Sequence, residues 1–219
     1  MKKKAVIFGM NKLSELMYYY LTHDDRYEPV AFSVDDEYCN TNEFMGLPVV
    51  KSSDLNKTYP PETYGIILTI GYSSMNNNRK DKFNALKSKG YDMLTYCHPS
   101  SVILTDNIGE GCLILENCTI GAYCELGRSN ILFSSTTIAH HSKTGDFNFF
   151  APESAIAGEA DIKDNCFFGI NCTVKNSVTI SAYTLVGAGV YISKNTEEYG
   201  VYVPERAIKL SKTSLEIKL

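Results

Sequence analysis

Residues 138–147, IAHHSKTGDF, contain the side chains best suited to acid–base chemistry in this sequence. They include the adjacent histidines His140 and His141 and the carboxylate of Asp146. A neutral imidazole can accept a proton near neutral pH, as the attack of an amine or a hydroxyl requires. A catalytic metal would need about three spaced ligands, which two neighbouring histidines do not supply. The stretch is therefore a candidate for acid–base chemistry, and its two histidines do not favour a metal site.

The sequence around this stretch follows a period of six residues. From Val102 to Ile192 every sixth residue is apolar, with Thr144 as the one polar member. Neither the 3.6-residue period of a helix nor the two-residue period of a strand produces this spacing. A hexapeptide repeat is typical of a parallel β-helix, in which short strands stack into coils. We expect about five triangular coils, stacked at a strand spacing of about 4.8 Å.

Cysteines occupy a second column of the same repeat. The residues two positions before the apolar column are small, and five of the seven cysteines stand there: Cys112, Cys118, Cys124, Cys166 and Cys172. A free buried thiol packs as a small hydrophobic group. The sequence contains no CxxC pair of the kind that binds metal or exchanges disulfides. We therefore expect these cysteines to be structural.

The first hundred residues instead alternate apolar runs with helical segments. Strands are predicted at 5–9, 28–36, 46–50, 65–71 and 92–97, and helices at 13–21 and 75–90. This alternation predicts a small parallel, Rossmann-like sheet with helices on its faces. The predicted architecture has three parts: an α/β domain at 1–98, a parallel β-helix at 99–198 and a C-terminal capping tail at 199–219.

Composition excludes several other classes of protein. The chain has 219 residues and a net charge of −4, which does not favour general nucleic-acid binding. No apolar run approaches the roughly 20 residues that span a bilayer. The N-terminal MKKKAVIFGM lacks the long apolar segment and the small-residue cleavage site of a signal peptide. We expect a cytoplasmic protein without a membrane partner.

The repeat resembles that of the hexapeptide-repeat acyltransferases, in segments such as IGEGCL, IGAYCE and VGAGVY. The order of the parts resembles one subfamily more closely: HPSSVI at the junction is followed by HHSKTGDF, FFGINCTV and VGAGVYI. That subfamily comprises the sialic-acid O-acetyltransferases and the N-acetyltransferases of UDP-4-amino sugars such as bacillosamine. The resemblance implies a left-handed winding of the β-helix, a homotrimer and acetyl-CoA as the acyl donor.

The resemblance also implies which histidine acts as the base. In the family the base precedes a Gly-Asp or Gly-Glu pair by five residues, and Gly145-Asp146 here selects His140. His141 is the alternative base. It stands where relatives carry an acid, so Asp146 or a residue of another chain is the expected orienting partner of His140. Adjacent residues in a strand point to opposite sides, so we expect the two histidines to have separate roles. Phe149 replaces a second histidine of the relatives.

In the family the acyl donor lies in a groove between two β-helices of a trimer. The matching positions here are Gly158, Gly169, Ile170, Gly187 and Ala188. Small residues allow a ligand to approach the backbone closely, although glycine also recurs in hexapeptide turns for structural reasons. Lys194 is the candidate contact for the phosphates of coenzyme A, with Arg206 and Lys209 as further candidates.

The α/β domain is expected to hold the acceptor. Gly9 and Asn11 lie in the turn after the first strand, where backbone N–H groups can bind phosphate. The later glycines of that motif are missing, and Asn11 can adopt a left-handed conformation that preserves the turn. Asp35 and Asp36 match the acidic pair that contacts the nucleotide base in the family. Ligands of open α/β sheets bind at this carboxyl edge.

These observations predict an acyl-CoA-dependent acyltransferase that modifies the amino group of a nucleotide-linked amino sugar for surface-glycan synthesis. Direct transfer, without an acyl-enzyme, is expected. One alternative is a sugar O-acetyltransferase of the sialic-acid type. The other is a non-catalytic β-helix that serves as a scaffold.

Overall fold

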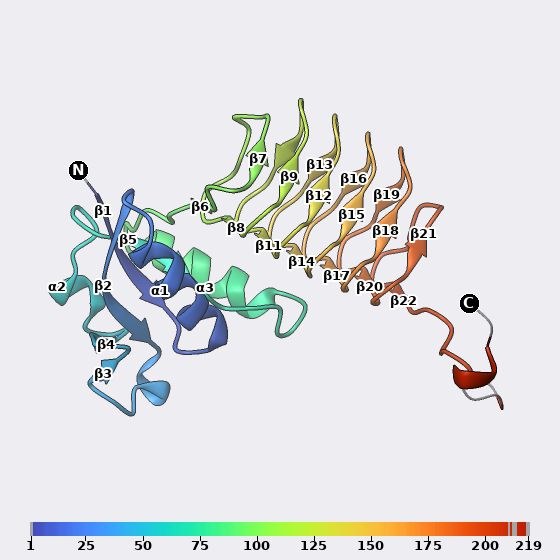
Figure 1. Cartoon of the computed structure of the whole chain (residues 1–219). Coiled ribbons are helices and arrows are strands. Elements are labelled where there is room, and N and C mark those ends of the chain that lie inside the picture. The colour runs from blue at the N-terminus through green and yellow to red at the C-terminus, as the bar shows by residue number, and fades with distance from the viewer. Residues whose placement is uncertain (1, 210, 212–213, 218–219) are drawn as a thin grey trace.

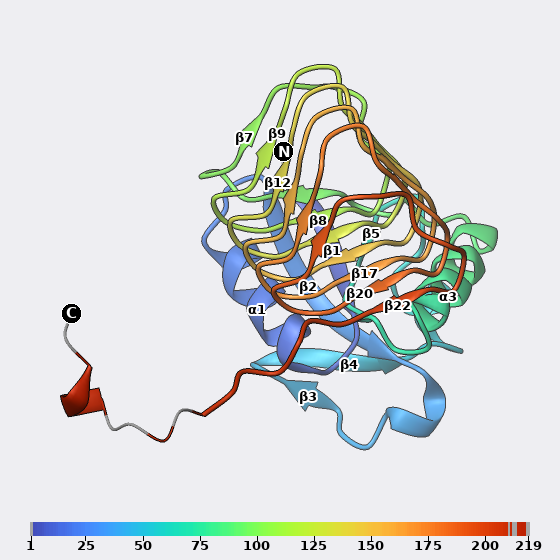
Figure 2. The ribbon, with the colours of Figure 1, turned by 90° about the vertical axis from the view of Figure 1, so that its right-hand side faces the viewer.

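The structure, a computed structural model, describes residues 2–209, 211 and 214–217. An α/β part forms one end of the molecule, and a column of stacked coils extends from it (Figure 1). Viewed along the column, the coils outline a triangle (Figure 2). The predicted combination of a small α/β part with a parallel β-helix is confirmed. In the described part of the chain, no helix has the length and apolar composition needed to cross a bilayer.

The α/β part is built on a five-stranded sheet of order β3-β4-β2-β1-β5. Its elements are β1 (Lys3–Phe8), α1 (Lys12–Thr22), β2 (Tyr27–Val34), η1 (Asp36–Tyr38), β3 (Glu43–Phe44), β4 (Leu47–Lys51), α2 (Leu55–Thr58), β5 (Gly65–Leu68) and α3 (Asn77–Ser88). Its pairings are parallel, except that β3 is antiparallel to β4. The chain moves outward from β1 through β2 to β4 and then returns to β5 on the other side of β1. The boundary between β1 and β5 is therefore the topological switch point at which such sheets bind ligands.

Alternate residues of β1 face opposite sides of this sheet, as a pleated strand requires. Ala5 and Ile7 belong to the core that α1 shares with the first coils of the β-helix. Val6 and Phe8 belong to the core formed with α2 and α3. The β-helix therefore packs directly against one face of the sheet beside α1.

Three parallel sheets form the walls of the β-helix. The seven-stranded sheet contains β6 (Tyr96–Cys97), β8 (Leu113–Ile114), β11 (Ile131–Leu132), β14 (Phe149–Phe150), β17 (Phe167–Phe168), β20 (Leu185–Val186) and β22 (Val201–Tyr202). The six-stranded sheet contains β7 (Val102–Ile103), β9 (Thr119–Ile120), β12 (Thr137–Ile138), β15 (Ala155–Ile156), β18 (Thr173–Val174) and β21 (Tyr191–Ile192). The four-stranded sheet contains β10 (Glu125–Leu126), β13 (Lys143–Thr144), β16 (Asp161–Ile162) and β19 (Thr179–Ile180). A short helix, η2 (Ser214–Glu216), lies near the C-terminus.

The core of the column follows from the period of six. From Ile114 onward the apolar column faces inward, and the five predicted structural cysteines are buried beside it. Burial raises the pKa of Cys112 and of Cys166 to about 12, so both thiols stay protonated near neutral pH. Thr144, the polar exception in the column, also faces inward with 4% of its surface exposed, and its hydroxyl has no hydrogen-bond partner.

The first coil departs from the predicted register. Val102 is 52% exposed, and its neighbour Ile103 packs against the core instead. Ile103 pairs with Ile120, which lies seventeen residues later, whereas Ile120 pairs with Ile138 eighteen residues later. The first coil is one residue short, and a shift of one residue exchanges the inward and outward positions of a strand.

Two other predicted segments differ from the structure. The stretch 92–97 makes two separate pairings: Met93 bridges Ile66 of the α/β sheet, and β6 pairs with β8 of the β-helix. In the predicted capping tail, β22 adds a strand to the seven-stranded sheet on the last coil, whereas the segment that follows, up to residue 209, extends away from the column (Figure 1). Residues 210, 212–213 and 218–219 of that tail lie outside the described residues.

Arg79 of α3 connects the α/β part to the β-helix. Its side chain is fully buried and donates hydrogen bonds to the carbonyl oxygens of Ser129, Phe147 and Asn148 at 2.9–3.1 Å. A further bond of 2.7 Å reaches the carbonyl of Gly71. No carboxylate among the described residues pairs with it. Burial lowers the pKa of the Arg79 guanidinium to about 9. This value is still above neutral pH, so the group stays charged there. The carbonyl dipoles of the coil turns compensate this buried charge.

Replacement of Arg79 with methionine tests this connection. The variant keeps a long side chain but leaves buried carbonyl groups without a donor, so we expect the free energy of unfolding to fall by about 3 kcal/mol. Urea unfolding followed by circular dichroism measures the change. Lys80→Met, on the neighbouring position of α3, is the control and should have little effect. Equal unfolding midpoints for the two variants would contradict the stabilising role of Arg79.

Candidate functional site

His140 and His141 lie in the turn that follows β12, at the corner between the six-stranded and four-stranded sheets. Both side chains are exposed. His141 has a φ of 59°, and this left-handed conformation brings the two rings together, with their Nδ1 atoms 3.1 Å apart. The expectation that the two side chains point to opposite sides is wrong, because it assumed a strand where the chain forms a turn.

Gly158 occupies the equivalent turn of the next coil, directly against the ring of His140. A Cβ atom at Gly158 would lie 2.6 Å from Cε1 and 2.8 Å from Nε2 of His140. The imidazole therefore occupies the space that any other side chain at this position would fill. This contact gives Gly158 a structural reason to be glycine, besides its predicted place beside the acyl donor.

Asp146 lies at a different corner of the coil, after β13. Its Oδ1 accepts a hydrogen bond from the backbone N–H of Arg128 at 2.6 Å, and its Oδ2 pairs with the Arg128 guanidinium at 2.6 Å. Asp164 stands at the equivalent position of the next coil and accepts from the backbone N–H of Asp146 at 2.8 Å. These carboxylates connect successive coils. The structure does not bring Asp146 to His140, and Asp146 is not its orienting partner within the chain.

The predicted donor-binding residues lie along two opposite edges of the six-stranded sheet. Gly158 and Lys194 follow its strands on the edge that carries His140, whereas Gly169, Ile170, Gly187 and Ala188 precede its strands on the other edge. Gly169 is tightly packed, since a Cβ atom there would lie 2.5 Å from the backbone nitrogen of Ala188. A single chain therefore does not gather these residues around one ligand. Within the described part of the chain, no three His, Cys, Asp or Glu side chains are grouped as metal ligands.

Phe149, at the position of the relatives' second histidine, is part of an aromatic cluster. Its ring stacks on that of Phe167 at 5.5 Å and meets the ring of Tyr72 edge-on at 4.8 Å. Only 6% of Phe149 is exposed. The FF pairs that begin at 149 and 167, one coil apart, are the sequence signal for this cluster. They indicate a hydrophobic layer beneath the α/β part.

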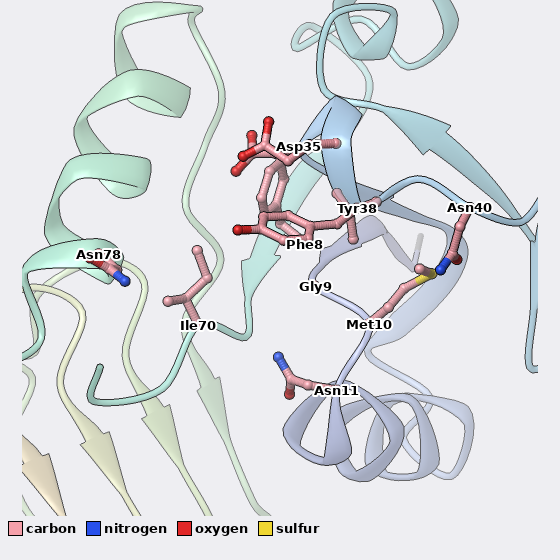
Figure 3. Close-up of a pocket in the computed structure, with 11 residues that line it drawn as sticks. Phe8, Gly9, Met10, Asn11, Asp35, Tyr38, Asn40, Ile70 and Asn78 are labelled. Atoms are coloured by element: carbon pink, nitrogen blue, oxygen red, sulfur yellow. The ribbon is translucent and has the colours of Figure 1, made fainter. Parts of the chain in front are cut away.

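A cavity of about 550 Å³ lies at the switch point of the α/β sheet (Figure 3). Its walls come from the ends of three strands and from α3: Phe8, Gly9, Met10 and Asn11 at the end of β1, Val34, Asp35, Glu37, Tyr38 and Asn40 at and after the end of β2, Ile70 after β5, and Asn78 in the first turn of α3. Three of the four predicted acceptor residues, Gly9, Asn11 and Asp35, line this cavity, and Asp36 does not.

Gly9 and Asn11 shape the cavity in different ways. Gly9 has a φ of 138°, and a Cβ atom there would overlap Oγ1 of Thr69. Asn11 has an extended backbone, with a φ of −138°, so the predicted left-handed conformation is wrong. Its side chain caps α1 by accepting from the backbone N–H groups of Leu13 at 2.9 Å and Ser14 at 3.2 Å. The cap occupies N–H groups that a phosphate would otherwise use.

The two adjacent carboxylates after β2 have separate roles. Asp35 lines the cavity, forms an ion pair with Lys82 of α3 and accepts from Oγ of Ser52 at 3.1 Å. Asp36 accepts from the backbone N–H of Ser53 at 3.1 Å, and hydrogen bonding from Ser53 lowers the pKa of Asp36. Asp36 therefore fixes the backbone of the segment that follows β4. Sequence reasoning missed Lys82, because the helical pattern of α3 does not distinguish it from a solvated lysine.

No family model matches the sequence. The chain is 31% identical over 101 residues to the GDP-perosamine N-acetyltransferase of Escherichia coli O157:H7. The aligned segment covers 46% of this chain and 45% of that protein. The chain thus spans less than half the length of this curated relative.

Solved structures match over almost the whole chain. The acetyltransferase domain of PglB from Neisseria gonorrhoeae FA1090 has a TM-score of 0.80 at 17% identity, covering 91% of this chain and 96% of that one. PerB from Caulobacter crescentus, in complex with CoA and GDP-perosamine, has a TM-score of 0.77 at 22% identity, covering 91% of both chains. GDP-perosamine-type N-acetyltransferases are thus among the relatives and structural neighbours of this chain, which shares their fold in both its α/β part and its β-helix.

Proposed function

We propose that this chain is an acyl-CoA-dependent N-acyltransferase. Acetyl-CoA is the donor, the amino group of a nucleotide-linked amino sugar is the acceptor, and His140 is the general base. The observation that carries the proposal is the geometry of His140. Its ring lies against Gly158, its Nδ1 contacts His141, and no described residue hydrogen bonds to its Nε2. An available Nε2 at an exposed turn suits a base that must face an incoming amine.

The proposed reaction is a direct transfer. The amine attacks the thioester carbon, an N–C bond forms, and Nε2 of His140 takes the proton that the amine loses. The tetrahedral oxyanion requires an N–H donor. The C–S bond then breaks, and the coenzyme A thiolate takes the proton from the imidazolium. The buried thiols of the β-helix stay protonated, as the raised pKa values of Cys112 and Cys166 indicate, and supply no competing nucleophile.

The donor site is proposed to form between two copies of the chain. One copy supplies the edge with His140 and Gly158, and a second supplies the opposite edge with Gly169 and Ile170. A cyclic trimer would join these two edges three times. The presence of CoA in the PerB complex supports coenzyme A thioesters as donors. Lys194 remains the candidate for the coenzyme phosphates.

The cavity of the α/β part is proposed to hold the nucleotide of the acceptor. Asp35 can accept hydrogen bonds from a nucleobase or a ribose, and the amides of Asn11 and Asn78 add donors and acceptors. The GDP-perosamine in the PerB complex supports a nucleotide sugar as acceptor. Because Asn11 caps α1, we expect recognition through the base and ribose more than through the diphosphate.

Several finer predictions from the sequence accompany this proposal. They are the division into 1–98, 99–198 and 199–219, the left-handed winding, the homotrimer, the cytoplasmic location and the role in surface-glycan synthesis. The likeness in fold to the PglB acetyltransferase domain and to PerB supports the division of the chain and the winding, and the other three rest on the resemblance of the sequence.

Substitution of His140 by alanine tests the base. We expect kcat to fall by at least about 100-fold, with acetyl-CoA binding retained, because only proton transfer is lost. Mass spectrometry of incubations with acetyl-CoA and GDP-perosamine or UDP-4-amino sugars measures the transfer, and calorimetry measures the binding. His98→Ala is the control. Full activity of His140→Ala would exclude His140 as the general base. Transfer by the wild type to sialic acid alone would indicate an O-acetyltransferase. A wild type that does not bind acetyl-CoA would favour a scaffold.

Substitution of Asp35 by asparagine tests the acceptor site. We expect the KM for the nucleotide sugar to rise by about tenfold, since a hydrogen bond to a charged carboxylate becomes a weaker one to a neutral amide, while the KM for acetyl-CoA stays the same. Asp36→Asn is a matched control, because Asp36 has the same charge and lies outside the cavity. Equal effects of the two substitutions would show that the cavity does not bind the acceptor.

Substitution of Gly158 by alanine tests the support of the His140 ring. The added methyl group displaces the imidazole, so we expect kcat to fall by roughly 100-fold with little change in the KM for acetyl-CoA. Gly71→Ala is the control, because a Cβ atom at Gly71 would meet nothing within 4 Å. A higher KM for acetyl-CoA at unchanged kcat would instead place Gly158 against the donor.

A further inference from the structure

The contact between His140 and His141 constrains where their hydrogens lie. The two Nδ1 atoms are 3.1 Å apart, and the ring planes are nearly perpendicular, at 84°. At this distance one Nδ1 must carry a hydrogen and the other must offer its lone pair. Two neutral rings satisfy the contact in only two ways, and each assigns opposite tautomers to the two histidines.

The chain holds His141 in place independently of His140. Its backbone N–H donates to the carbonyl of Ala122 at 3.0 Å, and its ring lies against the ring of Tyr123, 4.8 Å away and tilted by 30°. Tyr123 occupies the equivalent turn position of the preceding coil and has the same left-handed conformation, with a φ of 62°. His141 is therefore positioned by its turn and by this aromatic contact.

Among the described residues, no carboxylate hydrogen bonds to the ring of His140, whose partner is His141. Glu159, at the position of the next coil that is equivalent to His141, accepts a hydrogen bond from Oγ of Ser177 at 2.9 Å. Asp146 is engaged by Arg128 at another corner. Among the described residues, neither histidine forms an ion pair.

We propose that His141 is a positioning residue that sets the reactive tautomer of His140, an inference that rests on the proposed function. The Nδ1–H of His140 donates to the Nδ1 lone pair of His141, which carries its own hydrogen on Nε2. His140 then presents an unprotonated Nε2, the atom that takes the proton of the acceptor amine. The Nδ1–H bond to His141 persists in the resulting imidazolium. A neutral imidazole thus orients the base without a carboxylate.

Substitution of His141 by phenylalanine or asparagine tests this role. Phenylalanine keeps a ring against Tyr123 but removes the acceptor, and the fold already holds an aromatic residue in this conformation at Phe147, with a φ of 59°. Asparagine tolerates the left-handed conformation, and its amide oxygen can accept the Nδ1–H. His98→Phe, the same change at a histidine outside the turn, is the control.

The first measurement needs no substrate. In ¹⁵N-histidine-labelled protein at pH 8.5, long-range ¹H–¹⁵N correlations report which ring nitrogen carries the hydrogen. We expect His140 to be the Nδ1–H tautomer in the wild type and to lose that preference in His141→Phe, with His141→Asn retaining it. A wild-type His140 with its hydrogen on Nε2, or a tautomer unchanged in His141→Phe, would overturn the proposal.

The second measurement is the kinetics of acyl transfer. We expect His141→Phe to lower kcat by roughly 10- to 100-fold with unchanged KM values, and His141→Asn to recover a large part of the loss. Equal losses in both variants would reduce His141 to a structural role and overturn the proposal. If the wild type transfers no acyl group, the proposed function fails, and the NMR measurement still decides whether His141 sets the tautomer.

Discussion

The constraint on which the rest of this structure depends is the eighteen-residue coil of the β-helix. Three hexads close one triangular turn, so a residue and the one eighteen positions later lie in contact through parallel pairing. The stacked rings of Phe150 and Phe168, 4.6 Å apart, show how closely this register is kept in the core. The same register places Gly158 against His140, Tyr123 against His141 and Asp146 beside Arg128. Local features of the candidate site are thus consequences of the coil repeat.

The turns of the coil carry the functional differences. Their corner residues repeatedly adopt positive φ, so the side chains there do not follow the alternation of a strand. At one corner this geometry directs two histidines toward each other, and at another it aligns carboxylates with backbone N–H groups of the preceding coil. Asp146 and His140 lie at different corners, and the bonds of Asp146 to Arg128 engage its carboxylate there.

The α/β part depends on the β-helix for its own core. One face of its sheet is covered jointly by α1 and by outward-facing residues of the seven-stranded sheet, including Leu113, Ile131 and Phe149. Arg79 adds hydrogen bonds from α3 to the turns of two coils, at Ser129 and Phe147. The cavity at the switch point is therefore fixed relative to the coils that carry His140. In the proposed enzyme, this rigid connection would hold the acceptor site at a constant position relative to the β-helix.

The sequence by itself determined the parts whose signal is local and periodic. The period of six established the β-helix, its inward column and the structural cysteines, and the alternation of apolar runs with helical segments established the α/β part. The sequence also singled out His140 and Asp35. It failed where a side chain's position depends on turns and on neighbouring coils: the one-residue shift at Ile103, the contact of His140 with His141, the diversion of Asp146 to Arg128 and the cap formed by Asn11. These features were decided by the tertiary structure, because residues far apart in the chain, or turned by a left-handed backbone, meet only once the coils have stacked.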